Sequence, residues 1–164
     1  MVTVTIHRGP YLAIHNDSSP GLCFLRLFLT ASDSLSKHDH NLLSDCLHPD
    51  AAFTTNNSPA VKPDQILPML AMRSTKVSKF GHDVHIAWDI AEDDGRRTVM
   101  YESTSFTVFK DDPQSVEVRV NEFSIIELSK CDGGELKAIK LRTYMDPGPV
   151  LERAQLVLGK MGGM

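Results

Sequence analysis

The stretch "SVEVRVNEFSIIELSK", residues 115 to 130, decides the fold because its side chains alternate between two faces. One face carries residues that suit a protein interior, namely Val116, Val118, Val120, Ser124, Ile126 and Leu128. Successive side chains of a β-strand point to opposite sides, so the pattern predicts a strand with one face against a core. Glu122 lies in the middle of that same face. The sequence therefore predicts a carboxylate that points where core residues belong.

The inward orientation of Glu122 favours a catalytic role. A buried carboxylate without a partner is costly, and its pKa tends to rise until it takes up a proton. Such a group suits a general acid or base near neutral pH. Two alternatives stay open: a bulge near Asn121 that turns Glu122 outward, or a buried pair with an arginine. The alternation resumes after Glu122, which supports the inward orientation.

Ahead of this strand, the sequence predicts three helices and one short strand. Apolar residues recur at helical spacing from Leu22 to Leu35, and a second helix begins near Asp39, a good N-cap residue. The short strand is expected over residues 51–57. A third helix is expected over residues 62–80, with Pro68 in its first turn or at a kink.

Long strands surround the opening stretch, and tight turns join them. We expect strands over residues 82–91, 96–110, 115–130 and 136–146, and a last helix over 149–160. The turns "DDG" and "DDPQ" between the first three of these strands are hairpin signals. Helices followed by antiparallel strands indicate an α+β domain, in which helices pack across one face of a curved antiparallel sheet.

Length and composition fit one domain. The chain has 164 residues, 41% of them hydrophobic and 23% charged, as in ordinary globular proteins. We expect an N-terminal arm over residues 1–20 and a single domain over 21–164. The net charge of -4, without a basic stripe, argues against nucleic acid as a partner. Because there is no secretory signal, no membrane-spanning run and no spaced cysteine framework, we expect a cytoplasmic location.

The order of these elements, together with two short motifs, resembles the nuclear transport factor 2-like superfamily. "HDHNLLSDCLHPDAAF", residues 38 to 53, looks like the second helix of that superfamily running into its first strand. "LKAIKLRTYMDP", residues 136 to 147, looks like its last strand. The resemblance covers about residues 21 to 156, and it extends to the SnoaL-like polyketide cyclases and the ketosteroid isomerase-like proteins within the superfamily.

The resemblance implies a cone-shaped half-barrel whose concave face and helices enclose a pocket. It implies homodimers formed through the sheet. Members include isomerases, cyclases, dehydratases, epoxide hydrolases and non-catalytic binders, and several small fungal members act in terpenoid, polyketide or alkaloid pathways. Because one fold carries so many functions, the site has to be argued from residues.

Further carboxylates and tyrosines are candidates for the chemistry. Glu102, on the neighbouring strand, would line the same pocket as Glu122 if its face points inward, and it is solvent-exposed if that face is convex. Asp146 occupies the late position where the resemblance implies an acid-base aspartate, although it could instead cap a turn before Pro147. Tyr144 or Tyr101 could donate a hydrogen bond to a substrate carbonyl.

Three more residues are candidates for substrate binding. By alternation, His82 and Trp88 fall on one face of their strand. His82 is a minor candidate acid or base, or else a histidine of the core. Trp88 is a candidate pocket wall, or else a side chain that fills the core. Arg73 on the third helix is a candidate cation at the pocket rim, or else an ordinary exposed arginine. The histidines near residue 40 lack the spacing of a metal site, and no phosphate, nucleotide, haem or flavin motif occurs, so we expect no cofactor and no metal.

These observations predict a cofactor-independent isomerase or cyclase of secondary metabolism that acts by acid-base chemistry on a small apolar substrate. A dehydratase or epoxide hydrolase on the same scaffold is one alternative, since it would hold a water beside a carboxylate. A non-catalytic ligand-binding or interaction domain is the other. A deep pocket with converging Glu and Tyr side chains would favour catalysis.

Overall fold

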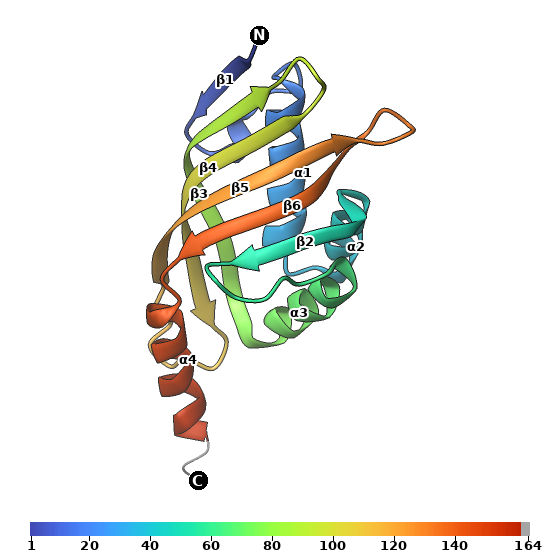
Figure 1. The fold of residues 1–164 in the computed structure, drawn as a ribbon. Helices are drawn as coiled ribbons and strands as arrows, with labels where there is room; N and C mark the ends of the chain where they lie inside the picture. Colours follow the sequence, from blue (N-terminus) through green and yellow to red (C-terminus); the bar gives the residue numbers. More distant parts are fainter. Residues whose placement is uncertain (162–164) are drawn as a thin grey trace.

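The computed structural model describes residues 1–161, which form a curved sheet with helices packed against it (Figure 1). The strands are β1 (Thr3–Arg8), β2 (Leu47–Thr55), β3 (Val77–Ala91), β4 (Arg97–Phe109), β5 (Val118–Lys130) and β6 (Leu136–Met145). The helices are the 3-10 helix η1 (Tyr11–Ala13) and the α-helices α1 (Pro20–Asp33), α2 (Lys37–Asp45), α3 (Pro63–Lys76) and α4 (Gly148–Met161). The α+β class with a curved sheet is confirmed.

The strands of the described residues follow the order β1-β3-β4-β5-β6-β2, and the sheet does not close into a barrel (Figure 1). Neighbouring strands are antiparallel, with the exception that β2 runs parallel to β6. The expected antiparallel sheet is therefore mixed at one edge. The reason is connectivity, because β2 is joined to the other strands through helix α3 and not by a tight hairpin turn.

Helices α1, α2 and α3 cover the concave face of the sheet (Figure 1). Helix α1 buries the apolar side that its spacing predicts, which includes Leu25, Phe28 and Leu29. These side chains belong to one cluster with Val99 and Ile126 of the sheet. Full burial of such a side chain contributes roughly 1.5–3 kcal/mol, so this layer fixes α1 against the sheet.

The beginning of α1 is also tied to β3 by the buried carboxylate of Asp89. Its Oδ2 accepts a hydrogen bond from the backbone N–H of Gly21 (2.8 Å) and pairs with Arg97. A carboxylate is favourable there because a helix N-terminus carries partial positive charge. A Cβ at position 21 would lie 2.4 Å from the Asp89 carboxylate, which explains the glycine.

The predicted third helix is too long at its C-terminal end. Residues 77 to 80 begin β3, and Val77 and Phe80 pair with Phe109 and Thr107 of β4. The open hydrogen-bonding edge of β4 takes up this segment, and β-branched Val77 suits a strand better than a helix. The strand assignment places Phe80 on the sheet, next to His82.

A bulge in β3 corrects the predicted face of Trp88. Val84 pairs with Ser103, but Ile86 pairs with Glu102, so His85 is an extra residue in the ladder. A bulge reverses the alternation beyond it. Ala87 and Asp89 are therefore the buried residues of this half of the strand, and Trp88 lies on the outer face opposite Met100.

Helix α4 continues beyond one end of the sheet (Figure 1). Arg153 anchors it to the turn between β4 and β5, since its Nε donates to Asp112 Oδ2 (2.8 Å). This pairing holds the pKa of Asp112 at about 2. Within residues 1–161, none of the helices has the length and apolar character needed to cross a membrane.

Candidate active site

Glu122 points toward the concave face of the sheet, as the alternation of β5 predicts. The pairing of β5 with β4 is continuous through Asn121 and Glu122, which lie opposite Thr104 and Ser103. The bulge that would have turned Glu122 outward is therefore not there. The side chain of Glu122 is only 8% exposed, and it lines a half-open cavity between the sheet and the helices.

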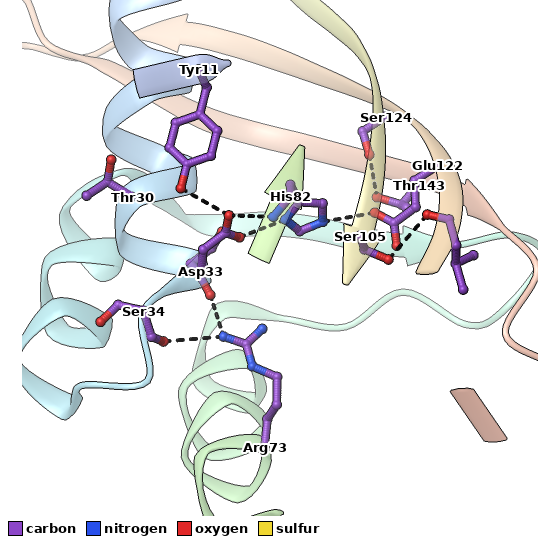
Figure 2. Close-up of polar contacts among 12 residues, drawn as sticks. Tyr11, Thr30, Asp33, Ser34, Arg73, His82, Ser105, Glu122, Ser124 and Thr143 are labelled. Carbon is purple, nitrogen blue, oxygen red and sulfur yellow. Dashed lines mark hydrogen bonds and ion pairs between the residues drawn. The ribbon is translucent and has the colours of Figure 1, made fainter. Parts of the chain in front are cut away.

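The partner of Glu122 is His82 of β3 (Figure 2). His82 Nε2 lies 2.9 Å from Glu122 Oε2, and His82 Nδ1 lies 2.7 Å from Asp33 Oδ1. The imidazole thus bridges two carboxylates, one from β5 and one from the last residue of α1. This histidine compensates the buried charge of Glu122. The arginine that the sequence left open as a partner is not the one used.

Asp33, the last residue of α1, is held in place by contacts from η1 and β3 (Figure 2). Its Oδ2 accepts hydrogen bonds from the Tyr11 hydroxyl (3.1 Å) and from the backbone N–H of His82 (3.0 Å), and its Oδ1 meets the imidazole. The side chain is 8% exposed. Because η1 supplies the tyrosine, β3 supplies the histidine and α1 carries Asp33 itself, the packing of these three elements sets the position of the imidazole.

The geometry favours a His82 that carries a proton on each ring nitrogen. A neutral imidazole has a single N–H donor, whereas here both ring nitrogens face carboxylate oxygens, which accept hydrogen bonds when ionised. Desolvation alone would lower the pKa of His82, but the hydrogen bonds and negative charges of Asp33 and Glu122 outweigh it and raise the pKa to about 9. The group is a cation between two acids at neutral pH.

The cavity beside Glu122 has a volume of about 280 Å³ and is mostly apolar. Its apolar lining comes from the helices and from β2 and β6, and consists of Phe28, Leu29, Leu43, Phe53, Ile66, Leu70 and Leu141. On the sheet side, Tyr101, Ser124 and Thr143 add hydroxyl groups beside Glu122. Burial raises the pKa of Tyr101 well above its ordinary value, so this phenol stays protonated and can donate a hydrogen bond.

Arg73 and Phe80 form another part of the cavity wall. The Arg73 guanidinium lies 3.8 Å from the ring centroid of Phe80, and the Phe80 ring meets the His82 imidazole edge-on with a centroid distance of 5.5 Å. Arg73 also donates to the backbone carbonyls of Ser32 and Ser34 near the end of α1 (Figure 2). These contacts fix a cation at the cavity.

Four of the residues selected from the sequence share this cavity, namely Glu122, His82, Tyr101 and Arg73. The other four lie elsewhere. Glu102 and Tyr144 are exposed on the outer face of the sheet and border an open depression there, whose lining also includes Glu122. Trp88 is on that outer face because of the β3 bulge. Asp146 is exposed and accepts a hydrogen bond from the Gly148 N–H (2.9 Å), the turn cap that was its alternative.

Sequence reasoning missed Asp33, Tyr11 and Phe80. Asp33 stands at the polar end of an apolar helix, where an acid looks like part of an ordinary terminus. Tyr11 falls in the segment expected to be an arm, and Phe80 falls in the part of β3 mistaken for helix. Among residues 1–161, no group of three or more His, Cys, Asp or Glu side chains is arranged to hold a metal ion.

No family model and no curated protein sequence matches the chain. Solved structures do share its fold. A ketosteroid isomerase-like protein from Erwinia carotovora atroseptica superposes with a TM-score of 0.60 at 12% identity, over 80% of this chain and 98% of that one. BvnE pinacolase from Penicillium brevicompactum gives a TM-score of 0.60 at 8% identity, over 81% and 90%. An M. tuberculosis LEH-like epoxide hydrolase gives a TM-score of 0.58 at 16% identity, over 85% of this chain and 92% of that one.

At these identities the comparisons show a shared fold and no particular reaction. The fold that the sequence resemblance implied, a curved sheet with helices on its concave face, is confirmed. The scaffold is one that enzymes of different kinds use, since an epoxide hydrolase and a pinacolase are both among the similar structures. The chemistry of this chain has to follow from its own side chains.

Proposed function

We propose that the protein is a cofactor-independent isomerase or cyclase that moves protons on a small, largely apolar cyclic intermediate of the polyketide, terpenoid or alkaloid type. One observation carries the proposal. Glu122 is a buried carboxylate in a mostly apolar cavity, and an imidazolium holds its Oε2. Among the described residues, no hydrogen bond engages its other oxygen, Oε1, which leaves that atom for a substrate.

In the proposed reaction, Glu122 acts as general base through this oxygen. It takes a proton from a carbon next to a substrate carbonyl, and the C–H electron pair moves to form an enolate. The Tyr101 hydroxyl donates a hydrogen bond to the developing oxyanion. Glu122 then returns the proton to a different carbon, so the double bond moves and no external oxidant or reductant is needed. In a cyclisation, the enolate carbon instead attacks a second carbonyl, and the alkoxide that forms there takes up the proton from Glu122.

His82 and Asp33 act as positioning residues for Glu122. The imidazolium stabilises the ionised carboxylate and fixes its rotamer, and Asp33 fixes the imidazolium. The apolar lining of the cavity excludes water, which would otherwise compete for the enolate.

The proposal is tested with a panel of β,γ-unsaturated cyclic ketones of increasing ring number in deuterium oxide. Wild-type protein should move the double bond into conjugation and exchange the α-protons, as followed by absorbance and mass spectrometry. Glu122→Gln should lower the rate by roughly 10²–10⁴-fold, the usual contribution of a general base. Thermal unfolding checks that this variant still folds.

Glu102→Gln is the matched control, because it changes the same group on the neighbouring strand at the outer face. It should turn over at the wild-type rate. Absence of exchange with every ketone, or equal rates in wild type and Glu122→Gln, would contradict the proposed function.

Hydration or epoxide opening is the second candidate. The hydroxyls of Ser124 and Thr143 are 2.9 Å apart and line the cavity together with Glu122, so a water could be held between a carboxylate and hydroxyl groups. Incubation of cyclohexene oxide in ¹⁸O-labelled water separates the two reactions. Labelled diol without ketone isomerisation would favour hydrolysis over the isomerase.

We also propose that two copies pair through the outer face of the sheet, the arrangement that the fold resemblance implies. The described helices α1 to α3 leave this face uncovered, and apolar side chains gather on it, among them Trp88, Met100, Phe123 and Ile125. Light scattering should give twice the monomer mass, and Ile125→Glu should give the monomer. A monomeric wild type would exclude the pair.

A further inference from the structure

The guanidinium of Arg73 is a cation at the cavity without a carboxylate partner. Its terminal nitrogen donates to two backbone carbonyls, and its Nε is buried without a hydrogen-bond partner. None of the ion pairs among the described residues includes Arg73. A partly buried charge without a counter-ion is costly, so its retention at a cavity wall points to a ligand that supplies one.

Asp33, the acid whose charge acts on Arg73, is committed elsewhere. Both of its oxygens are taken by Tyr11 and His82. Burial lowers the pKa of Arg73 to about 10, while the charge of Asp33 opposes the shift, so the side chain stays protonated at neutral pH. Phe80 orients the guanidinium by stacking under it, which reduces the mobility of the cation without neutralising it.

We propose that the substrate of this site carries an anionic oxygen, either a carboxylate or an ionised enol, and that Arg73 binds it. The proposal rests on the proposed function for the reacting end of the molecule. Glu122 repels an anion, so the acidic group lies against Arg73 while the reacting carbon lies against Glu122. The cavity of about 280 Å³ suits an acid of one to three fused rings more than a larger polycycle.

The test uses two ligands of nearly equal shape, β-naphthoate and its neutral amide, β-naphthamide, with isothermal titration calorimetry. Wild-type protein should bind the carboxylate more tightly than the amide, roughly tenfold or more, since a charge-assisted contact is lost in the amide. The preference should shrink as salt is added, because the guanidinium is only partly buried. Equal affinity for the two ligands would overturn the proposal.

Arg73→Met should remove the preference for the carboxylate while leaving amide binding nearly unchanged. Arg73→Gln is the second variant, since it keeps hydrogen-bonding capacity toward Ser32 and Ser34 if the Met variant fails to fold. Arg119→Met is the matched control, because it removes the same charge from an exposed position on the outer face. A carboxylate preference that survives both Arg73 variants, or that disappears in Arg119→Met, would overturn the assignment to Arg73.

The binding test and the catalytic test can give opposite outcomes, so each proposal can be refuted without the other. Glu122→Gln should keep or increase the preference for β-naphthoate, because it removes a negative charge from the cavity without touching Arg73. Loss of turnover in Glu122→Gln with no carboxylate preference in wild type would refute the anionic substrate alone. A carboxylate preference without any turnover would refute the proposed reaction alone.

Discussion

The two ends of helix α1 are tied to the same strand, β3, by two buried carboxylates. At the N-terminal end, Asp89 of β3 accepts from the Gly21 N–H and pairs with Arg97. At the C-terminal end, Asp33 of the helix accepts from the His82 N–H and imidazole of β3. Both contacts hold helix to sheet, and both bury charge.

The difference between the two ends is the nature and surroundings of the cation. Arg97 keeps its charge at every accessible pH, and Asp89 is 1% exposed. His82 can lose its proton, and it lies between the cavity at Glu122 and a second cleft bordered by Tyr11 and Asp33. The comparison teaches that the same kind of contact is structural where the carboxylate is sealed from solvent and the cation is permanently charged. It suits chemistry where it is titratable and open to a cavity.

The largest effect is expected at the sealed end. Asp89→Ala leaves Arg97 partly buried without its partner and removes the acceptor of the Gly21 N–H, so the free energy of unfolding should fall by about 3–5 kcal/mol. Urea unfolding measures this. The control Asp83→Ala removes an exposed aspartate of the same strand and should change stability by about 0.5 kcal/mol or less. If both variants lost a similar free energy of unfolding, burial of the ion pair would not determine its contribution to stability.

The next effect is a pH dependence that only the open end should show. The pKa of His82 is raised from 6.5 to about 9, so the folded protein holds this proton more tightly than the unfolded chain does. The stabilisation is therefore complete below pH 6.5 and is lost as the pH rises through about 9. The free energy of unfolding should fall by at most about 3 kcal/mol across this window.

Urea unfolding at several pH values across the window measures the slope, and His82→Gln supplies the comparison. The variant is expected to be less stable, but its free energy of unfolding should be flatter in this window because the titrating group is gone. If the free energy of unfolding changed equally with pH in the two proteins, another group would be titrating. That result would contradict an imidazolium bridge between Asp33 and Glu122.

The sequence was sufficient for the features that depend on local pattern. Strict alternation placed Glu122 inward, and the order of helices and strands predicted the α+β architecture, because each depends on neighbours a few residues apart. It failed for Trp88, since one extra residue at His85 reverses the faces and no local signal marks that bulge. It left Glu102 undecided between the pocket and the convex face, because alternation alone does not say which face of β4 points inward.

The composition of the site was harder to predict because its contacts are long-range. Asp33 meets His82 across 49 residues, and His82 meets Glu122 across 40. Each of the three looks ordinary in its own segment: a helix-terminal acid, a histidine in a strand and one polar residue on an apolar face. Only the packing of α1 onto β3 and β4, together with the pairing of β4 with β5, brings them together.

The smallest effect is expected from Tyr11, which completes the open end from outside. Tyr11→Phe removes the hydroxyl that donates to Asp33 Oδ2 (3.1 Å), and a single hydrogen bond to a charged group contributes about 1.5–3 kcal/mol at most, less where water can replace the donor. We expect a loss of about 1 kcal/mol in urea unfolding.

Because Asp33 then depends more on the imidazole, an NMR titration should show His82 still doubly protonated at neutral pH. Tyr144→Phe, which alters a 44% exposed tyrosine on the outer face, should change neither quantity. If Tyr11→Phe instead lowered the pKa of His82 toward its ordinary value, the tyrosine would be holding the charge of the bridge and not merely the position of Asp33.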